Sequence, residues 1–146
     1  MNKYKEMKDK HHKEVNDFPF FFAFNAKQFE EGMKKLGLDA KDTDKIYKFG
    51  NTGGFYRKTD SAMLKEMLVR HDREMAEAIA ADTTGDGFIY DMFMYELANH
   101  EYCITYDFEP TLDACGLEYS EVMDNPALRA GLKKAEADYM AQSDEW

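Results

Sequence analysis

The spacing of apolar side chains along the chain predicts amphipathic helices. Apolar residues three and four positions apart lie on one face of a helix. This spacing occurs over residues 26–36, over residues 62–81 and from Asn125-Pro126 onward. Asn25 is suited to cap the first of these helices, with Gln28 three positions later and Gly37 just past the helix end.

Two further segments have helical character without this simple stripe. Phe88–Asn99 is apolar on nearly all sides, so we expect a helix that is buried over most of its surface. Pro110 is suited to the first position of a short helix that ends at Gly116. Between them, Tyr102–Tyr106 is open to interpretation as the end of a helix or as a strand.

Aromatic runs and glycines predict a small antiparallel sheet. Phe18–Phe24 has the composition of a buried strand, with Pro19 near its start, where no ladder donor is needed. Ile46–Phe49 and Phe55–Arg57 flank Gly50–Gly54, which we interpret as a hairpin turn and not as a phosphate-binding loop, because no helix follows it. The predicted fold class is α+β, with a small antiparallel sheet of about three strands packed against four to five helices.

The length of 146 residues is typical of one domain. Residues 1–16 are rich in Lys and His and lack an apolar stripe, so we expect a basic N-terminal arm, either a solvated helix or a frayed terminus. Residues 17–142 form the predicted single α+β domain, and residues 143–146 form a predicted acidic tail.

Several features favour a cytoplasmic protein. No segment has the composition of a signal peptide, and the longest apolar run is too short to span a bilayer. Cys103 and Cys115, the only cysteines, form no recognisable disulfide framework, and neither lies in a C-x-x-C motif. We therefore expect reduced thiols and no contact with a membrane.

The net charge of the chain indicates which kinds of partner it is suited to bind. The net charge is −10; residues 1–14 carry five Lys against three acidic residues, so the rest of the chain has a net charge of −12. Such a body repels nucleic acid, so direct phosphate binding is not expected, whereas a basic surface on a protein partner would be attracted. Acidity that serves solubility alone is the alternative that this pattern leaves open.

The segment Asp82–Ile89 resembles the first two thirds of a calcium-binding loop. Asp82, Thr84 and Asp86 occupy the first, third and fifth ligand positions, and a turn glycine follows. The twelfth position, which supplies a bidentate carboxylate in such loops, is Phe93. We therefore prefer an Asp/Gly turn in which Asp86 caps the following helix.

The doublet His71-Asp72 invites comparison with metal-dependent phosphohydrolases, which place a His, a His-Asp doublet and a later Asp around a metal. Here His11 or His12 would precede the doublet, and Asp113 would follow it. His71 also lies on the apolar stripe of its predicted helix, however. A core imidazole held by one hydrogen bond is the simpler interpretation.

Glu96 and His100 are four positions apart and share one face of a predicted helix. A carboxylate and an imidazole are suited to bind Zn²⁺ or to transfer protons. They supply only two ligands, so a polar seam at the helix end is the simpler interpretation. A small metal-dependent hydrolase that uses His71, Asp72, Glu96 and His100 is the alternative function, and it requires these side chains to converge.

Two short stretches carry a family resemblance. They are residues 22–32, FAFNAKQFEEG, and residues 96–102, ELANHEY. They resemble a family of small uncharacterised proteins carried by phages, plasmids and gut Firmicutes, and the resemblance runs from about Phe20 to Gly116. It implies no catalytic residue, because no activity is associated with the family. It implies a genomic context instead: accessory genes of mobile elements, some of which counter host defences.

These observations favour an acidic, non-enzymatic interaction protein of a mobile genetic element. We expect it to occupy a basic nucleic-acid-binding surface of a partner protein, as an anti-defence inhibitor of the anti-CRISPR kind would, with carboxylates in place of phosphates. No complete set of catalytic residues is recognisable, and we expect no cofactor and no metal. The oligomeric state is left open.

Overall fold

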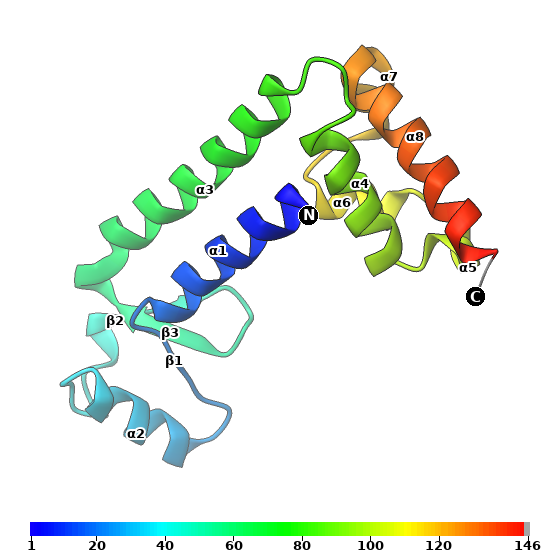
Figure 1. Ribbon diagram of the computed structural model, residues 1–146. Helices are drawn as coiled ribbons and strands as arrows, with labels where there is room; N and C mark the ends of the chain where they lie inside the picture. Colours follow the sequence, from blue (N-terminus) through cyan, green and yellow to red (C-terminus); the bar gives the residue numbers. More distant parts are fainter. Residues whose placement is uncertain (145–146) are drawn as a thin grey trace. The chain divides into compact units, whose positions relative to one another are not determined.

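The computed structural model describes residues 1–144 and confirms the α+β class (Figure 1). The chain forms two compact units: unit 1 comprises residues 1–10 and the residues from 73 onward, and unit 2 comprises residues 11–72. Helices α1 (Lys3–Asp17) and α3 (Ser61–Ala81) contribute residues to both units. The single domain over residues 17–142 stays a prediction.

Unit 2 contains the three-stranded antiparallel sheet, with strand order β1-β3-β2. Strands β2 (Ile46–Phe49) and β3 (Gly54–Arg57) form the predicted hairpin, in which every residue of β2 is paired with one of β3. Gly50 and Gly53 have φ values of 54° and 80°, which glycine adopts without steric cost. Strand β1 (Phe21–Phe22) is shorter than the predicted aromatic strand and pairs with β3.

The predicted signals at the ends of helix α2 (Ala26–Lys35) are present in unit 2. Oδ1 of Asn25 accepts a hydrogen bond from the backbone N–H of Gln28 at 2.8 Å. The side chain of Gln28 accepts from the N–H of Phe24, also at 2.8 Å, so the reciprocal bond lies one residue earlier than in a capping box. Gly37 has φ 76°, as expected just past a helix end.

Phe21 connects the sheet to α2. Its ring stacks on Phe55, with a centroid separation of 5.1 Å. A Cβ atom on Gly32 of α2 would lie 2.0 Å from Cδ1 of Phe21, so the helix reaches this ring because residue 32 has no side chain. Unit 2 also contains a hydrophobic cluster of three buried side chains, Phe18, Phe20 and Leu64.

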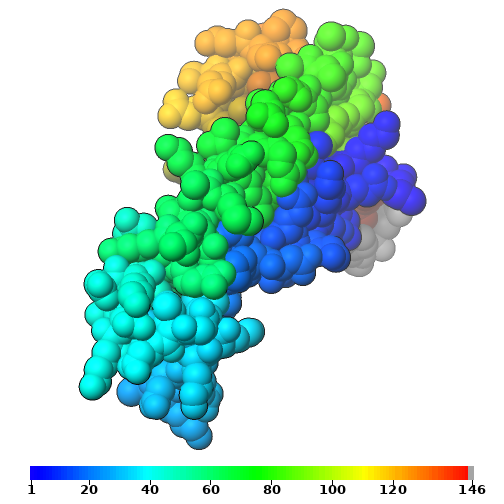
Figure 2. Space-filling model, turned by 90° about the vertical axis from the view of Figure 1, so that its left-hand side faces the viewer, coloured from blue at the N-terminus to red at the C-terminus, as the bar shows by residue number. Residues whose placement is uncertain are grey.

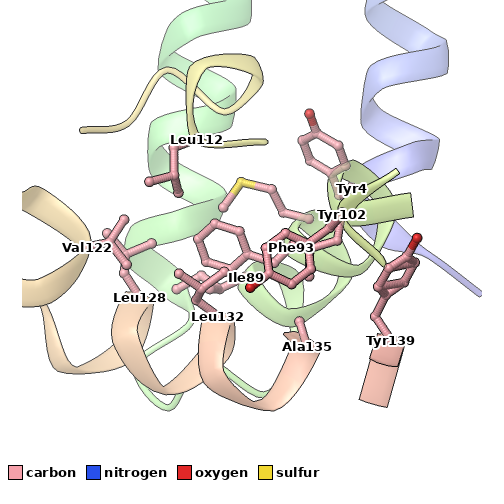
Figure 3. Close-up of a cluster of buried hydrophobic side chains, with 12 residues drawn as sticks. Tyr4, Ile89, Phe93, Tyr102, Leu112, Val122, Leu128, Leu132, Ala135 and Tyr139 are labelled. Carbon is pink, nitrogen blue, oxygen red and sulfur yellow. The ribbon is translucent and has the colours of Figure 1, made fainter. Parts of the chain in front are cut away.

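Unit 1 is built on helices α4 (Phe88–Asn99) and α8 (Pro126–Ser143), which pack against each other (Figure 1). Both helices were predicted, and Asn125 caps α8 through its side chain. Gly131 permits the close approach, because a Cβ atom there would lie 2.5 Å from Cγ2 of Ile89. Figure 3 shows the core that these helices share with shorter elements; its most buried members include Met92, Phe93, Leu97, Val122 and Ala135.

The short helices of unit 1 differ most from the prediction. The chain forms α5 (Tyr102–Thr105), α6 (Glu109–Ala114) and α7 (Tyr119–Asp124), so the described residues contain eight α-helices and not four to five. The segment α7 was not predicted; it begins with a capping box between Glu118 and Glu121. Pro110 lies in the first turn of α6, at the second helical position and not at the predicted first.

The structure describes the predicted basic N-terminal arm and part of the predicted acidic tail. Residues 1–16 belong mostly to α1, and Tyr4 on this helix is only 2% exposed, so the segment is not solvated throughout. Of the predicted acidic tail, Ser143 ends α8, and residues 145–146 lie outside the described residues. Within residues 1–144, no helix has both the length and the apolar character needed to cross a bilayer.

Candidate functional site

The acidity of the chain belongs to unit 1. Unit 1 contains 19 acidic residues against eight Lys and Arg, a net charge of −11, whereas unit 2 has ten against eleven, a net charge of +1. Residues 101–124 contain seven acidic residues and no Lys, Arg or His, and all seven are exposed. They are Glu101, Asp107, Glu109, Asp113, Glu118, Glu121 and Asp124.

Four of these carboxylates line a surface pocket of about 580 Å³. We call it the acidic–aromatic pocket. Its other walls are three aromatic rings and two leucines. The lining residues are Tyr106, Asp107, Phe108, Glu109, Leu112, Asp113, Leu117, Glu118 and Tyr119. Figure 2 shows part of this segment, coloured yellow to orange, at the surface of the molecule.

Local backbone geometry positions the walls of the pocket. Tyr106 has φ 54°, a left-handed conformation that is uncommon outside glycine and that turns the chain after α5. Oδ1 of Asp107 accepts from the N–H of Glu109 at 3.0 Å at the start of α6. Phe108 stacks on the buried ring of Tyr102, with centroids 4.5 Å apart and planes 12° apart. The pocket is therefore anchored to the core of unit 1.

The charge in the pocket is not neutralised by the protein itself. None of the four carboxylates forms an ion pair with any residue in the described part of the chain. Tyr106 and Tyr119 are 67% and 59% exposed, so their rings are accessible at the rim. Carboxylates beside accessible aromatic faces are suited to bind a cation, which gains both charge attraction and a contact with the ring face.

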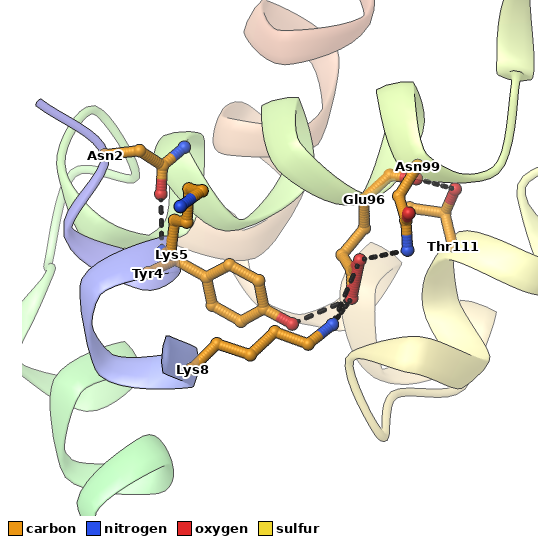
Figure 4. Close-up of polar contacts among 7 residues, drawn as sticks. All are labelled: Asn2, Tyr4, Lys5, Lys8, Glu96, Asn99 and Thr111. Atoms are coloured by element: carbon orange, nitrogen blue, oxygen red, sulfur yellow. Dashed lines mark hydrogen bonds and ion pairs between the residues drawn. The ribbon is translucent and has the colours of Figure 1, made fainter. Parts of the chain in front are cut away.

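Glu96, a predicted catalytic residue of the hydrolase alternative, is fully buried. Its carboxylate accepts hydrogen bonds from Tyr4 Oη at 2.8 Å, from Lys8 Nζ at 3.1 Å and from Asn99 Nδ2 at 3.3 Å (Figure 4). Burial and the bond to Glu96 raise the pKa of Tyr4 far above its ordinary range, so the phenol stays a donor. This geometry gives Glu96 a structural role, because it joins α1 to α4 within unit 1.

The residues of the hydrolase alternative are divided between the two units. Glu96 and His100 belong to unit 1, and His71 and Asp72 belong to unit 2. His100 follows α4, and its Nε2 is buried without a hydrogen-bond partner among residues 1–144. Across the same residues, no three His, Cys, Asp or Glu side chains form a group that could hold a metal ion. The hydrolase stays a prediction.

His71 is part of a polar cluster in unit 2. Its ring stacks on His11, with centroids 3.9 Å apart, and its Nε2 lies 3.1 Å from the Glu14 carboxylate. Arg70 donates to the same carboxylate. The hydrogen bonds from Arg70 and His71 lower the pKa of Glu14 to about 2. His71 was expected to be a core imidazole held by one hydrogen bond. In the structure it is nearly buried, and its partner is a carboxylate.

Asp82 organises the loop that resembles a calcium site. Its carboxylate accepts hydrogen bonds from the N–H groups of Gly85, Gly87 and Ile89, at 2.9, 3.0 and 3.0 Å. Burial opposes ionisation of this carboxyl, but these backbone donors outweigh burial and lower its pKa. The prediction that Asp86 caps α4 was wrong, because the N–H of Ile89 in the first turn of that helix donates to Asp82 instead.

The remaining members of this loop have other partners. Asp86 lies 3.6 Å from Lys134 Nζ. Thr84 Oγ1 accepts from the N–H of Asp86 at 3.3 Å. The loop is thus held by its own backbone donors, by the ion pair with Lys134 and by the close approach of Gly85 to Ala127 and Gly131 of α8.

The two cysteines show no sign of a nucleophile. Burial and the nearby Glu96 charge raise the pKa of Cys115 to about 12, so its thiol stays protonated. Tyr139 Oη donates to Sγ of Cys103 at 3.2 Å. Cys115 is partly buried and packs against the core of unit 1.

Sequence analysis missed the acidic–aromatic pocket, although one signal for it is visible. No Lys or Arg occurs from Glu74 to Leu128, a stretch with thirteen acidic residues. The net charge was assigned to all residues after residue 14, which include most of unit 2. The concentration of acidic residues in unit 1 was therefore not recognised.

Comparison with known proteins gives a family and no activity. No curated protein and no solved structure matches the chain. A family model does match, over residues 3–138, and it covers all of unit 2 and most of unit 1. The chain therefore belongs to a family of unknown function, DUF7659.

Proposed function

We propose that this chain is a non-enzymatic interaction protein that binds a basic surface of a partner protein through the acidic–aromatic pocket. The observation that supports the proposal is the pocket itself, in which four carboxylates without ion-pair partners among the described residues surround three aromatic rings. A charge arrangement that served solubility alone would not need a concave site with accessible rings.

Arg is the side chain that suits this pocket best. A planar guanidinium binds a carboxylate through two parallel hydrogen bonds and stacks on an aromatic face at the same time. Lys gains the charge attraction but not the planar match. The net charge of −11 on unit 1 also attracts a basic surface from a distance and raises the rate of association.

The partner class follows from the same chemistry. Surfaces that bind nucleic acid present clusters of Arg and Lys to phosphates. A rigid set of carboxylates competes for such a cluster. We extend the proposal to an inhibitor that blocks a nucleic-acid-binding surface, and, given the resemblance to proteins of mobile elements, to an anti-defence role against a host nuclease in the cytoplasm.

The test is a titration of the protein against a fluorescently labelled Arg-rich peptide. Binding is monitored by fluorescence anisotropy at several salt concentrations. The variant Glu109→Gln/Asp113→Asn removes two pocket charges and keeps the side-chain shapes. The control variant Glu30→Gln/Glu66→Gln removes the same charge from exposed positions of unit 2.

We expect the pocket variant to weaken binding about tenfold or more, since two charge contacts are lost, and the control to bind nearly as the native protein does. Binding should also weaken as salt screens the charges. Equal losses in both variants would show a general charge effect and would refute the assignment to the pocket.

A further inference from the structure

A second pocket adjoins the acidic–aromatic pocket. It has a volume of about 220 Å³, and it shares Phe108 and Tyr119 with its larger neighbour. The two pockets therefore meet at the same pair of rings. Met123 and Leu132 add apolar wall, and Arg129 and Lys133 contribute positive charge.

The placement of these cations is selective. From Glu74 to Asp144 the chain contains three Lys and Arg residues: Arg129, Lys133 and Lys134. The first two line the second pocket, whereas Lys134 lies 3.6 Å from Asp86 elsewhere in unit 1. A strongly acidic stretch thus places two of its three cations one turn apart on α8, beside its most acidic pocket.

The surroundings leave these cations available to a ligand. Arg129 donates one N–H to the carbonyl of Met123 at 3.1 Å, which orients the guanidinium and leaves other donors. Lys133 forms no ion pair within residues 1–144. Glu136 also lines the pocket, but its carboxylate accepts from Tyr102 Oη at 2.7 Å.

We infer that the two pockets form one bipolar groove, and that its occupant is an extended peptide segment of a partner that carries a basic and an acidic side chain two positions apart. This inference rests on the proposed function and adds a second requirement to it. Residues two apart on an extended chain lie on the same side, about 7 Å from each other. The basic side chain enters the acidic–aromatic pocket, and the carboxylate lies against Arg129 and Lys133.

Three synthetic peptides of equal length test the inference, with Arg-Ser-Glu, Arg-Ser-Gln or Gln-Ser-Glu at their centres between glycines. Binding is measured by NMR titration of the ¹⁵N-labelled full chain. We expect Arg-Ser-Glu to bind about two- to fivefold more tightly than Arg-Ser-Gln, as one partly exposed ion pair allows. Gln-Ser-Glu should bind most weakly.

A pair of adjacent lysines supplies the matched variants. Lys133→Glu should reverse the preference, so that Arg-Ser-Gln binds more tightly than Arg-Ser-Glu. Lys134→Glu changes the net charge equally and should leave the preference intact. Near-ultraviolet circular dichroism checks that both variants are folded.

The outcomes separate this inference from the proposed function. If both Arg peptides bind equally well to the native chain, or if the two variants behave alike, the inference is overturned while the acidic–aromatic pocket remains a cation site. If no Arg peptide binds, the proposed function fails as well. A dimer in sedimentation that Lys133→Glu dissociates would show that a second copy occupies the groove, which also overturns the inference.

Discussion

Replacing Tyr4 with Phe tests whether Glu96 is a structural carboxylate. The change removes one hydroxyl group, which donates to Glu96 at 2.8 Å. The ring keeps its edge contact with Phe88 at 5.9 Å and its tilted contact with Tyr95 at 5.7 Å. The measured effect is therefore dominated by one hydrogen bond and not by lost packing.

The size of the effect follows from the surroundings of the carboxylate. A hydrogen bond to a charged group contributes about 1.5–3 kcal/mol to stability. Glu96 would keep its bonds from Lys8 and Asn99, so the carboxylate is not left without a partner. We expect Tyr4→Phe to lower the free energy of unfolding by about 2 kcal/mol.

The assay is urea unfolding followed by far-ultraviolet circular dichroism. The control is Tyr119→Phe, because this ring is 59% exposed and its loss of a hydroxyl should cost less than about 0.5 kcal/mol. A double-mutant cycle with Glu96→Gln then isolates the coupling between the two side chains, which we expect to be about 1–2 kcal/mol.

Alkaline pH gives a second measure of the same bond. Burial and Glu96 raise the pKa of Tyr4, so the folded state keeps the phenol neutral while the unfolded chain ionises above about pH 10. Stability contributed by Tyr4 is therefore present below that pH and lost above it, and Tyr4→Phe should lose less. Equal stability of Tyr4→Phe and Tyr119→Phe would refute the reasoning, and Glu96 would again be a candidate for chemistry.

Three further predictions concern packing, reactivity and acid stability. Gly32→Ala should destabilise the protein by about 1–3 kcal/mol in urea unfolding, despite the helix propensity of Ala, because its Cβ would lie 2.0 Å from the Phe21 ring; a gain in stability would contradict this contact. Native Cys115, whose pKa burial raises to about 12, should react with iodoacetamide far more slowly than in urea, and equal rates would count against its burial. The Arg70 hydrogen bond holds the pKa of Glu14 at about 2, so its stabilising contribution is present above about pH 4.5 and lost as the pH falls; Glu14→Gln should flatten the acid-unfolding curve there.

The larger elements were predictable because hydrophobic spacing and end signals agree. Asn25 and Gly37 mark the ends of α2 in the sequence, and both perform those roles in the structure. In the short helices, hydrophobic spacing and end signals do not support each other in this way. Helix α5 lies between Glu101 and Tyr106, two non-glycine residues with left-handed backbones, and propensity does not predict such a conformation.

The candidate sites show the limit of sequence spacing more clearly. Spacing placed Glu96 and His100 on one helix, but the main partner of Glu96 is Tyr4, 92 positions away, and no local pattern connects them. The acidic–aromatic pocket has a local signal, because its lining residues lie within residues 106–119. Its rings converge only because Phe108 stacks on Tyr102 in the core, which is a tertiary contact.

An NMR titration of the ¹⁵N-labelled chain with the Arg-rich peptide tests the central claim most directly. We expect the largest shift changes in residues 106–119 and in adjoining core positions such as Tyr102, and no change in residues of unit 2. Shift changes spread evenly over the acidic residues of unit 1, or centred on unit 2, would contradict it.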